Sequence, residues 1–329
     1  MRSDPLAITF ADVQSAADVI DGVAVRTPLL EFLPLSERVG SRVLVKFEGL
    51  QHTGSFKFRG AYNRLARLTP EERKAGVVAW SSGNHAQGVA AAAKMLDIKA
   101  AIVMPADAPA VKIANTRALG AEIIAYDRYT QSREEIATDL ARARGATLVP
   151  SFDDPFIIAG QGTAGLEIVE QAAAAGADIG RLLVCCGGGG LVAGIATAVR
   201  ETHPEVPIYS VEPEAFDDTA RSLVSGRRET VAPGATSICD ALLAPSPGAL
   251  TFPINKALLT AGLSVSDAEV AEAMRFAFLS LKLVVEPGGA VALAALLAGK
   301  APAAAGATVI VMSGANVDGA DFARILANG

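Results

Sequence analysis

The stretch Leu182-Leu183-Val184-Cys185-Cys186-Gly187-Gly188-Gly189-Gly190-Leu191 decides how this chain is interpreted. An apolar run of strand length leads directly into four glycines, and a helical pattern, Val192–Glu201, follows. Glycines at the start of a helix leave bare backbone N–H groups, which carry partial positive charge. We therefore predict a strand–turn–helix unit in which the turn Gly187-Gly188-Gly189-Gly190 binds a phosphate.

Short apolar runs alternate with helical patterns on both sides of this unit, which is typical of parallel sheets covered by helices. The fold class predicted from this alternation is α/β. Strands are expected at residues 43–47, 77–80, 100–103, 122–125, 182–186, 208–211 and 308–312. Helices are expected at residues 56–67, 86–96, 111–119, 132–143, 163–174, 192–201, 267–279 and 290–297.

A compact strand–helix–strand–helix–strand series lies between Thr69-Pro70 and Pro150. We predict that residues 75–150 form a small domain inserted into a larger one. Residues 1–74 and 151–329 build the larger domain together in this interpretation.

The composition of the 329-residue chain excludes several classes of protein. Hydrophobic residues make up 51% and charged residues 19%, so a large core is available and a disordered chain is excluded. The formal net charge of −6 argues against a nucleic-acid partner. No apolar run reaches the roughly 18 residues of a membrane span, and residues 1–10 lack the apolar core of a secretory signal. We therefore expect a cytoplasmic protein without a membrane partner, whose three cysteines are reduced.

Two interpretations of the glycine turn remain open at this point. Gly188, Gly190 and Ala193 match the G-x-G-x-x-G/A spacing of a dinucleotide site, and Glu212 ends the next strand, where an acid meets a ribose hydroxyl in such sites. The alternative ligand is a single phosphate on a different cofactor. The glycines alone do not distinguish these ligands from each other, or from a close-packed turn without a ligand.

A lysine between two phenylalanines is the second candidate site. In Ser55-Phe56-Lys57-Phe58, Ser55, or Thr53 before it, is placed to cap a helix whose first turn contains Lys57. Apolar surroundings and the positive helix end both lower the pKa of an amine, which makes Lys57 a candidate nucleophile. The alternative is a lysine whose ammonium group simply reaches the solvent.

Two further turns follow predicted strands and carry hydroxyl and amide groups. In Ser81-Ser82-Gly83-Asn84-His85, the backbone amides from Ser82 to His85 offer a site for a substrate carboxylate, and the Asn84 amide can reach a ring oxygen. His85 is expected to pack at the helix start rather than act as a base. Ser313 places a hydroxyl at the carboxyl end of the sheet, where α/β sheets bind ligands. Helix capping and a structural turn are the alternatives.

Together these motifs resemble the fold-type II pyridoxal-phosphate enzymes, specifically the serine/threonine dehydratase and serine racemase family. The resemblance runs from Arg26 to Asp318, and the dinucleotide interpretation accounts for only one of its motifs. It implies two open, mostly parallel sheets flanked by helices, as in the tryptophan synthase β fold, with a small mobile domain that contributes to the substrate site. The resemblance is carried by Ser55–Ala61, Ser81–Gln87, Ala159–Thr163, Gly187–Gly190 and Ser313–Asn316.

The resemblance implies a role for each site residue. Lys57 would form the Schiff base with pyridoxal 5'-phosphate and remove the substrate's α-proton, and Ser82 aligns with the position that protonates the opposite face in racemases. Because a serine hydroxyl cannot hold a pyridinium proton as a carboxylate does, loss of a β-hydroxyl is favoured over long-lived carbanion chemistry. Cofactor contacts are expected from Phe56 at the ring, Asn84 at the phenolic oxygen, Ser313 at the pyridine nitrogen and Gly187–Gly190 at the phosphate.

The activity that the resemblance implies is that of an ammonia-lyase. A β-hydroxy amino acid such as L-threonine or L-serine would lose water and give a 2-oxo acid and ammonia. Phe152 resembles the dehydratase pattern. Racemisation of serine or aspartate and deamination of 3-hydroxyaspartate are the alternatives. Arg133 aligns where family members reach a carboxylate, which makes 3-hydroxyaspartate a candidate substrate, and a plain surface arginine on the predicted helix 132–143 is the equal alternative. Ala315 and Cys239-Asp240-Ala241 depart from the family pattern and leave the substrate open.

A metal site and self-association are also implied by the resemblance. Glu212, Asp218 and the carbonyl of Phe216 match the family's divalent-cation site, and two carboxylates with a carbonyl suit Mg²⁺ or Ca²⁺. Two solvated acids in a loop are the alternative. We further expect a homodimer or homotetramer that acts on a small amino-acid substrate.

Overall fold

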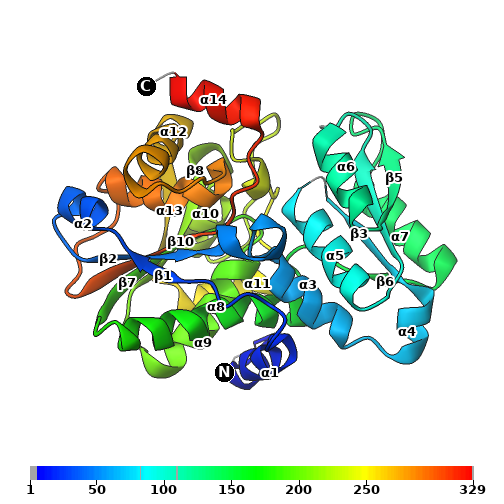
Figure 1. Ribbon diagram of the computed structural model, residues 1–329, viewed down its shortest axis with the longest axis horizontal. Helices are drawn as coiled ribbons and strands as arrows, with labels where there is room; N and C mark the ends of the chain where they lie inside the picture. The colour runs from blue at the N-terminus through cyan, green and yellow to red at the C-terminus, as the bar shows by residue number, and fades with distance from the viewer. Residues whose placement is uncertain (1–5, 82, 109, 328–329) are drawn as a thin grey trace.

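This computed structural model describes residues 6–81, 83–108 and 110–327. The described chain forms two β-sheets, each flanked by helices (Figure 1). The larger sheet has six strands in the order β1-β2-β10-β7-β8-β9, and the smaller has four in the order β5-β4-β3-β6. Neighbouring strands run parallel in both sheets, apart from the antiparallel pair β1 and β2. The predicted α/β class with two open, mostly parallel sheets is therefore confirmed.

The strands are short and the helices vary widely in length. The strands are β1 (Leu29–Glu31), β2 (Val43–Phe47), β3 (Val77–Trp80), β4 (Ala100–Pro105), β5 (Glu122–Tyr126), β6 (Thr147–Leu148), β7 (Ile179–Cys185), β8 (Ile208–Pro213), β9 (Ala261–Val265) and β10 (Ala307–Met312). The helices are α1 (Phe10–Ile20), α2 (Leu33–Val39), α3 (Lys57–Ala66), α4 (Pro70–Ala75), α5 (Asn84–Met95), α6 (Ala110–Ala118), α7 (Arg133–Arg144), α8 (Pro155–Ala174), α9 (Gly190–Thr202), α10 (Asp218–Ser225), α11 (Thr251–Leu258), α12 (Asp267–Phe276), α13 (Pro287–Leu297) and α14 (Gly319–Ala327).

Every predicted strand and helix is present, and the largest error concerns α8. This helix begins at Pro155, eight residues before the predicted start at residue 163. Pro155 occupies its first turn, and the Asp154 carboxylate accepts hydrogen bonds from the N–H groups of Phe156 and Ile157. Gly160 and Gly162, within its first half, obscured the pattern.

The two shortest strands were not predicted, and one predicted helix ends earlier than expected. β1 and β6 are only three and two residues long, too short to show a period in the sequence. The predicted helix at residues 267–279 leaves the α form at Phe276, and one π turn, Ala277–Leu281, follows it.

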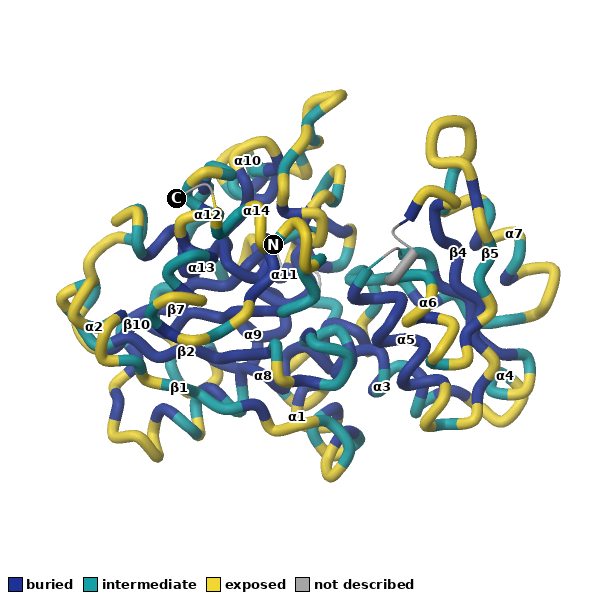
Figure 2. Tube along the Cα trace, turned by 45° about the horizontal axis from the view of Figure 1, so that its top comes forward, coloured by how far each residue is buried: buried dark blue, intermediate teal, exposed yellow. Residues whose placement is uncertain are grey.

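The inner strands of the larger sheet are buried on both faces, as the dark blue tube at β2 and β10 shows in Figure 2, whereas the edge strands β1 and β9 are mostly half-buried. All residues of β2 and β10 are buried, which is why these strands are mainly apolar runs rather than alternating patterns. Lys46 interrupts β2, and its ammonium pairs with Glu167 at 2.6 Å.

All four strands of the smaller sheet lie within residues 75–150 (Figure 1). Phe58 and Leu65, on α3 before this range, pack into the same apolar cluster as β3 and β4. Helix α3 thus packs against the smaller sheet, although it precedes residues 75–150 in the sequence. The domain boundaries and the mobility of the small domain stay predictions.

No helix among the described residues combines the length and the apolar character that crossing a membrane requires.

Helices α3 and α8 cross with almost no space between their backbones. A Cβ added at Gly160 would lie 2.6 Å from the Cα of Gly60 and 2.9 Å from the carbonyl oxygen of Arg59. Two glycines therefore meet where the helix that begins at Lys57 rests on α8.

We expect Gly160→Ala to destabilise the protein by about 1–3 kcal/mol, because α3 must move to admit the methyl group. Urea unfolding followed by circular dichroism measures this change. Gly319→Ala is the matched control, since a Cβ at Gly319 meets nothing within 4 Å. Equal effects of the two substitutions would contradict the close approach of α3 and α8.

Candidate active site

The four candidate motifs, which are the glycine turn, Ser313, the Lys57 segment and the Asn84 segment, lie at strand ends or helix N-termini. The neighbouring parallel strands β7 and β10 end at Cys185 and Met312, so the glycine turn and Ser313 leave the larger sheet at the same edge. Helix α9 begins at the last glycine of that turn, while α3 begins at Lys57 and α5 at Asn84.

The N-terminus of α3 is tied to the segment that follows β10. Ser55 forms an isolated antiparallel bridge with Gly314, and the N–H of Phe56 donates to the carbonyl of Ser313 at 3.1 Å. The prediction that Thr53 or Ser55 caps α3 is wrong, because both hydroxyls lie buried without a hydrogen-bond partner among the described residues. Backbone pairing with the sheet, rather than a side-chain cap, fixes the start of this helix.

The Lys57 side chain folds inward from the first turn of α3. Its Nζ donates to the carbonyl of Ser151 at 2.8 Å and lies 5.1 Å from the centre of the Phe56 ring. Burial lowers the pKa of Lys57 to about 8, and the neighbouring Cys185 and Glu286 offset that burial only in part. About a tenth of this amine is therefore uncharged at pH 7, far more than for a lysine at the ordinary value of 10.5.

The glycine turn presents bare backbone to the same region. Gly189 is left-handed with φ 90° and forms the N-cap of α9. The carbonyl of Gly188 accepts from Thr251 Oγ1 at 2.6 Å, while the N–H groups of Gly187–Gly190 have no acceptor within the described ranges. The turn thus offers several free donors at the positive end of a helix, as an anion site requires.

Ser151 and Phe152 stand between the lysine and the glycine turn. The carbonyl of Ser151 holds Lys57 Nζ, and a Cβ at Gly188 would overlap the ring of the adjacent Phe152. Cys185, two residues before the turn, is close enough to influence the pKa of Lys57. The structure therefore brings the amine and the phosphate-binding candidate together from opposite parts of the sequence.

Asn84 is held by hydrogen bonds on both sides of its amide. Its Nδ2 donates to Glu286 Oε1 at 2.6 Å, and its Oδ1 accepts from Asn316 Nδ2 at 2.8 Å. Asn316 also donates to the carbonyl of Thr53 at 2.7 Å. Burial, followed by the charge of Asp240, raises the pKa of Glu286 to about 8, so this carboxyl group is largely protonated near neutral pH.

A thiol faces the hydroxyl of Ser313. Burial raises the pKa of Cys185 to about 11, and the nearby Ser313 hydroxyl offsets that rise only in part. Both groups are buried and both are uncharged at neutral pH. A ring nitrogen that met Ser313 would therefore have neutral partners.

The family model for pyridoxal-phosphate dependent enzymes matches residues 20–314. This chain belongs to that family. It is 46% identical over 318 residues to an L-threo-3-hydroxyaspartate ammonia-lyase of a Pseudomonas species, covering 97% of this chain and 98% of the relative. It is 42% identical to an L-threonine ammonia-lyase of Thermotoga maritima, covering 98% and 79%. The solved structure of maize serine racemase superposes with a TM-score of 0.91 at 34% identity and 98% coverage of both chains.

The residues of this pyridoxal-phosphate dependent enzyme fit its cofactor. A desolvated primary amine suits the cofactor's aldehyde, and the free N–H groups of Gly187–Gly190 suit its phosphate. Glycine is required in that turn, because a Cβ at Gly189 would lie 2.5 Å from Asn255 Nδ2. The individual contacts assigned to Phe56, Asn84 and Ser313 stay predictions.

The turn Ser81–His85, predicted to bind the substrate carboxylate, is only partly described by the structure. Ser82 lies outside the described residues. The hydroxyl of Ser81 accepts from the N–H of Gly83 at 3.1 Å, and Gly83 is the N-cap of α5. His85 is buried, its Nε2 contacts the carbonyl of Val149 at 2.9 Å, and burial lowers its pKa to about 3. The expectation that His85 packs at the helix start rather than acts as a base agrees with these contacts.

Arg133 is not brought to the site by the contacts that the structure records. It is the first residue of α7, and its side chain is 43% exposed and pairs with Glu134 at 2.9 Å. Its role in binding a carboxylate stays a prediction without support from these contacts.

The predicted metal site contains two buried carboxylates. Glu212 is fully buried and accepts from the N–H groups of Thr219 and Ala220, while Asp218 Oδ2 has no partner among the described residues. Burial raises the pKa of Asp218 to about 7. The alternative of two solvated acids is thus wrong. The ion itself, with a Phe216 carbonyl ligand, stays a prediction, because the described residues hold no cluster of three or more His, Cys, Asp or Glu suited to a metal.

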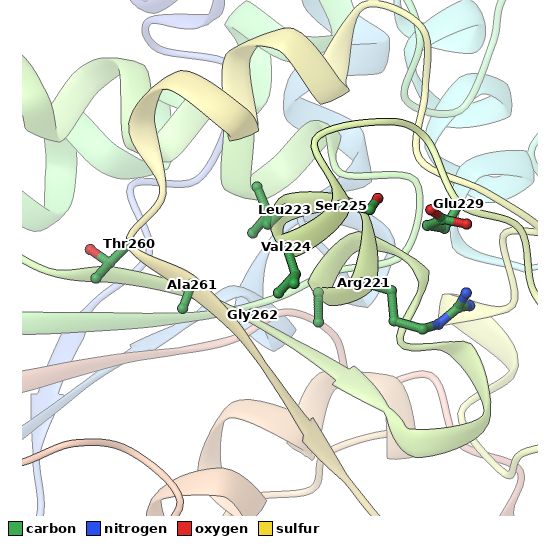
Figure 3. A pocket seen from close by; sticks show the side chains of 9 residues that line it. Arg221, Leu223, Val224, Ser225, Glu229, Thr260, Ala261 and Gly262 are labelled. Carbon is green, nitrogen blue, oxygen red and sulfur yellow. The ribbon is translucent and has the colours of Figure 1, made fainter.

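Glu286, Cys185 and Ser151 contact or influence the site residues but were not predicted from the sequence. A signal for Glu286 existed, because Glu286-Pro287-Gly288-Gly289 starts a helix after a β-branched run. A hollow of about 500 Å³ between α10 and β9 (Figure 3) lies elsewhere, and its lining includes none of the predicted site residues.

We expect the amine of Lys57 in cofactor-free protein to react with an acylating reagent with a midpoint near pH 8, because the neutral fraction grows as the pH passes the lowered pKa. Mass spectrometry of the peptide that contains Lys57, across a pH series, measures this. A midpoint at the ordinary lysine value of 10.5 would contradict the desolvated position.

Glu286 should make stability depend on pH. Its folded-state pKa of about 8 exceeds the ordinary 4.5, so its contribution is complete below pH 4.5 and is lost as the pH rises through 8. Glu286→Gln retains the acceptor for Asn84 without a titrating group. We expect its free energy of unfolding, relative to wild type, to rise between pH 5 and pH 8.5 in urea titrations of cofactor-free protein. A constant difference between the two proteins would show that Glu286 does not titrate abnormally.

Proposed function

We propose that this enzyme is an ammonia-lyase that removes water and ammonia from β-hydroxy amino acids. The observation that carries the proposal is the amine of Lys57, desolvated and placed beside a turn of free N–H groups. The ammonia-lyases of Pseudomonas and Thermotoga, at 46% and 42% identity, support this reaction class. L-Threonine, L-serine and 3-hydroxyaspartate are the proposed substrates.

Lys57 is the base in this proposal. Pyridoxal phosphate, when bound, supplies the electron-withdrawing ring that acidifies the α-proton of the amino acid. The neutral Lys57 amine accepts that proton at Nζ, which its pKa of about 8 allows near neutral pH. His85 is a poor alternative, because its Nε2 is engaged with the carbonyl of Val149.

The surroundings of Ser313 favour elimination of the β-hydroxyl over delocalisation of negative charge into the cofactor ring. Its hydroxyl and the Cys185 thiol are both neutral, so neither group stabilises a protonated ring nitrogen as a carboxylate would. Negative charge formed at the α-carbon therefore leaves with the β-hydroxyl. The net change is loss of the hydroxyl as water, followed by hydrolysis of the resulting enamine to a 2-oxo acid and ammonia.

Hydrogen bonds to Asn84 orient its amide for the proposed contact with the cofactor ring. Glu286 and Asn316 hold the Asn84 amide from both sides, so its remaining N–H is directed without an entropic search. The N-terminus of α5 beside it is the proposed site of the substrate carboxylate. Self-association into a homodimer or homotetramer also belongs to this proposal.

The test is an assay of purified enzyme with L-threonine, L-serine and both 3-hydroxyaspartate diastereomers, reading 2-oxo acid, ammonia and enantiomer ratio. We expect 2-oxo acid and ammonia in equal amounts. Lys57→Ala should lower turnover by at least about 10³-fold and abolish the absorbance near about 415 nm. Lys94→Ala, a change at an exposed lysine of α5, is the matched control.

Two results would overturn the proposal. Turnover that survives Lys57→Ala would remove the base, and accumulation of the D-amino acid without 2-oxo acid would indicate the racemase named for the maize relative.

A further inference from the structure

An ion pair joins the two sheet regions close to the site. Lys112, on α6 beside the smaller sheet, pairs through Nζ with Asp240 Oδ2 at 2.8 Å, and Asp240 begins a short 3-10 turn, Asp240–Leu242, in the larger region. The Lys112 side chain is 20% exposed, whereas that of Asp240 is 55% exposed. The cation is therefore mostly covered, while its carboxylate partner is open to replacement.

The turn that carries Asp240 rests on the phosphate-binding candidate. A Cβ added at Gly187 would lie 3.2 Å from the Cα of Leu242, and one at Gly288 would lie 3.1 Å from its side chain. The segment Asp240–Leu242 thus forms part of the wall between the glycine turn and the start of α13.

Both members of the pair also act on the interior of the site. The charges of Asp240 and Lys112, together with that of Lys57, influence the pKa of Glu286, whose carboxyl contacts Asn84 at 2.6 Å. Lys112 is therefore a cation within electrostatic reach of the groups that surround the substrate. A covered cation already bonded to a carboxylate has the chemistry to bind another carboxylate in its place.

We propose that Lys112 binds the side-chain carboxylate of a dicarboxylic β-hydroxy amino acid, which displaces Asp240. This inference rests on the proposed function and names its preferred substrate class. Asp240 stands in for the second carboxylate when none is present, so a monocarboxylic substrate leaves the pair intact. The exchange replaces one charge-assisted hydrogen bond by another, and the covered ammonium is never left unpaired.

Arg133 is the competing candidate for this role. Its guanidinium pairs with Glu134, its own neighbour in sequence, and has no recorded contact with any other described residue of the site. Lys112, by contrast, bonds across to the wall of the site. The geometry therefore favours the lysine.

A matched pair of inhibitors isolates the side-chain carboxylate. L-Aspartate and L-alanine both lack the β-hydroxyl that must leave, and they differ by one carboxylate. Lys112→Met should weaken L-aspartate binding about 10- to 100-fold, the range for a hydrogen bond to a charged group, and change L-alanine binding less than about threefold. Dissociation constants come from the change in cofactor absorbance on titration of the holoenzyme.

Asp240→Asn supplies a result that a purely structural ion pair would not give. It removes the carboxylate that competes for Lys112, so L-aspartate should bind about three- to tenfold more tightly while L-alanine is little affected. The kcat/KM ratio of L-threo-3-hydroxyaspartate to L-threonine should fall in Lys112→Met and rise in Asp240→Asn.

Three outcomes would overturn the inference. The first is equal weakening of both inhibitors by Lys112→Met and by Asp240→Asn, which would make the pair only a link between the two regions. The second is a selective loss of L-aspartate binding in Arg133→Met. The third is L-aspartate binding to Lys112→Met that is no weaker than binding to wild type. Failure of the proposed function is a separate result, seen as absence of 2-oxo acid from every substrate in the wild type. The inhibitor titrations test Lys112 in that case as well, because they require binding and not turnover.

Discussion

The backbone pairing between the start of α3 and the segment after β10 is the constraint on which the site depends. Ser55 bridges Gly314, and the N–H of Phe56 bonds the carbonyl of Ser313, so the first turn of α3 is fixed against the end of a buried strand. The Lys57 side chain points inward from that turn and donates to the carbonyl of Ser151. Its lowered pKa follows from that position, because burial outweighs the charges around it.

A network of buried ion pairs also fixes the position of α3. Arg59, two residues after Lys57, is fully buried and bonds Glu48 at 2.8 Å and Glu167 at 2.6 Å, and Lys46 shares Glu167. Buried ion pairs of this kind add little net stability over apolar packing, because desolvation offsets their attraction. They do specify one arrangement, since each charge would be left unpaired in any other. The close contact of Gly60 with Gly160 acts in the same direction through sterics.

The charges around the site divide into a neutral interior and a charged wall. Lys57, Glu286, Cys185 and His85 all have pKa values shifted toward their uncharged forms by burial. Lys112 and Asp240 form an ion pair with each other nearer the solvent. The proton transfer that we propose thus involves an amine that can be neutral, and the recognition of a charged side chain that we propose is assigned to the charged wall.

The sequence by itself determined the α/β class, the strands that lead into the glycine turn and Ser313, and Lys57 as a candidate reactive amine. These are local properties, since apolar runs, glycines and a lysine among aromatic residues follow from short segments. Tertiary structure alone decided that Glu286 and Asn316 orient Asn84, that Cys185 faces Ser313, and that Lys112 pairs with Asp240. It also decided that backbone pairing, and not Thr53 or Ser55, starts α3. Those contacts join residues far apart in the chain, such as Asn84 and Asn316, which are separated by 232 positions, and no local pattern encodes a distance across the fold.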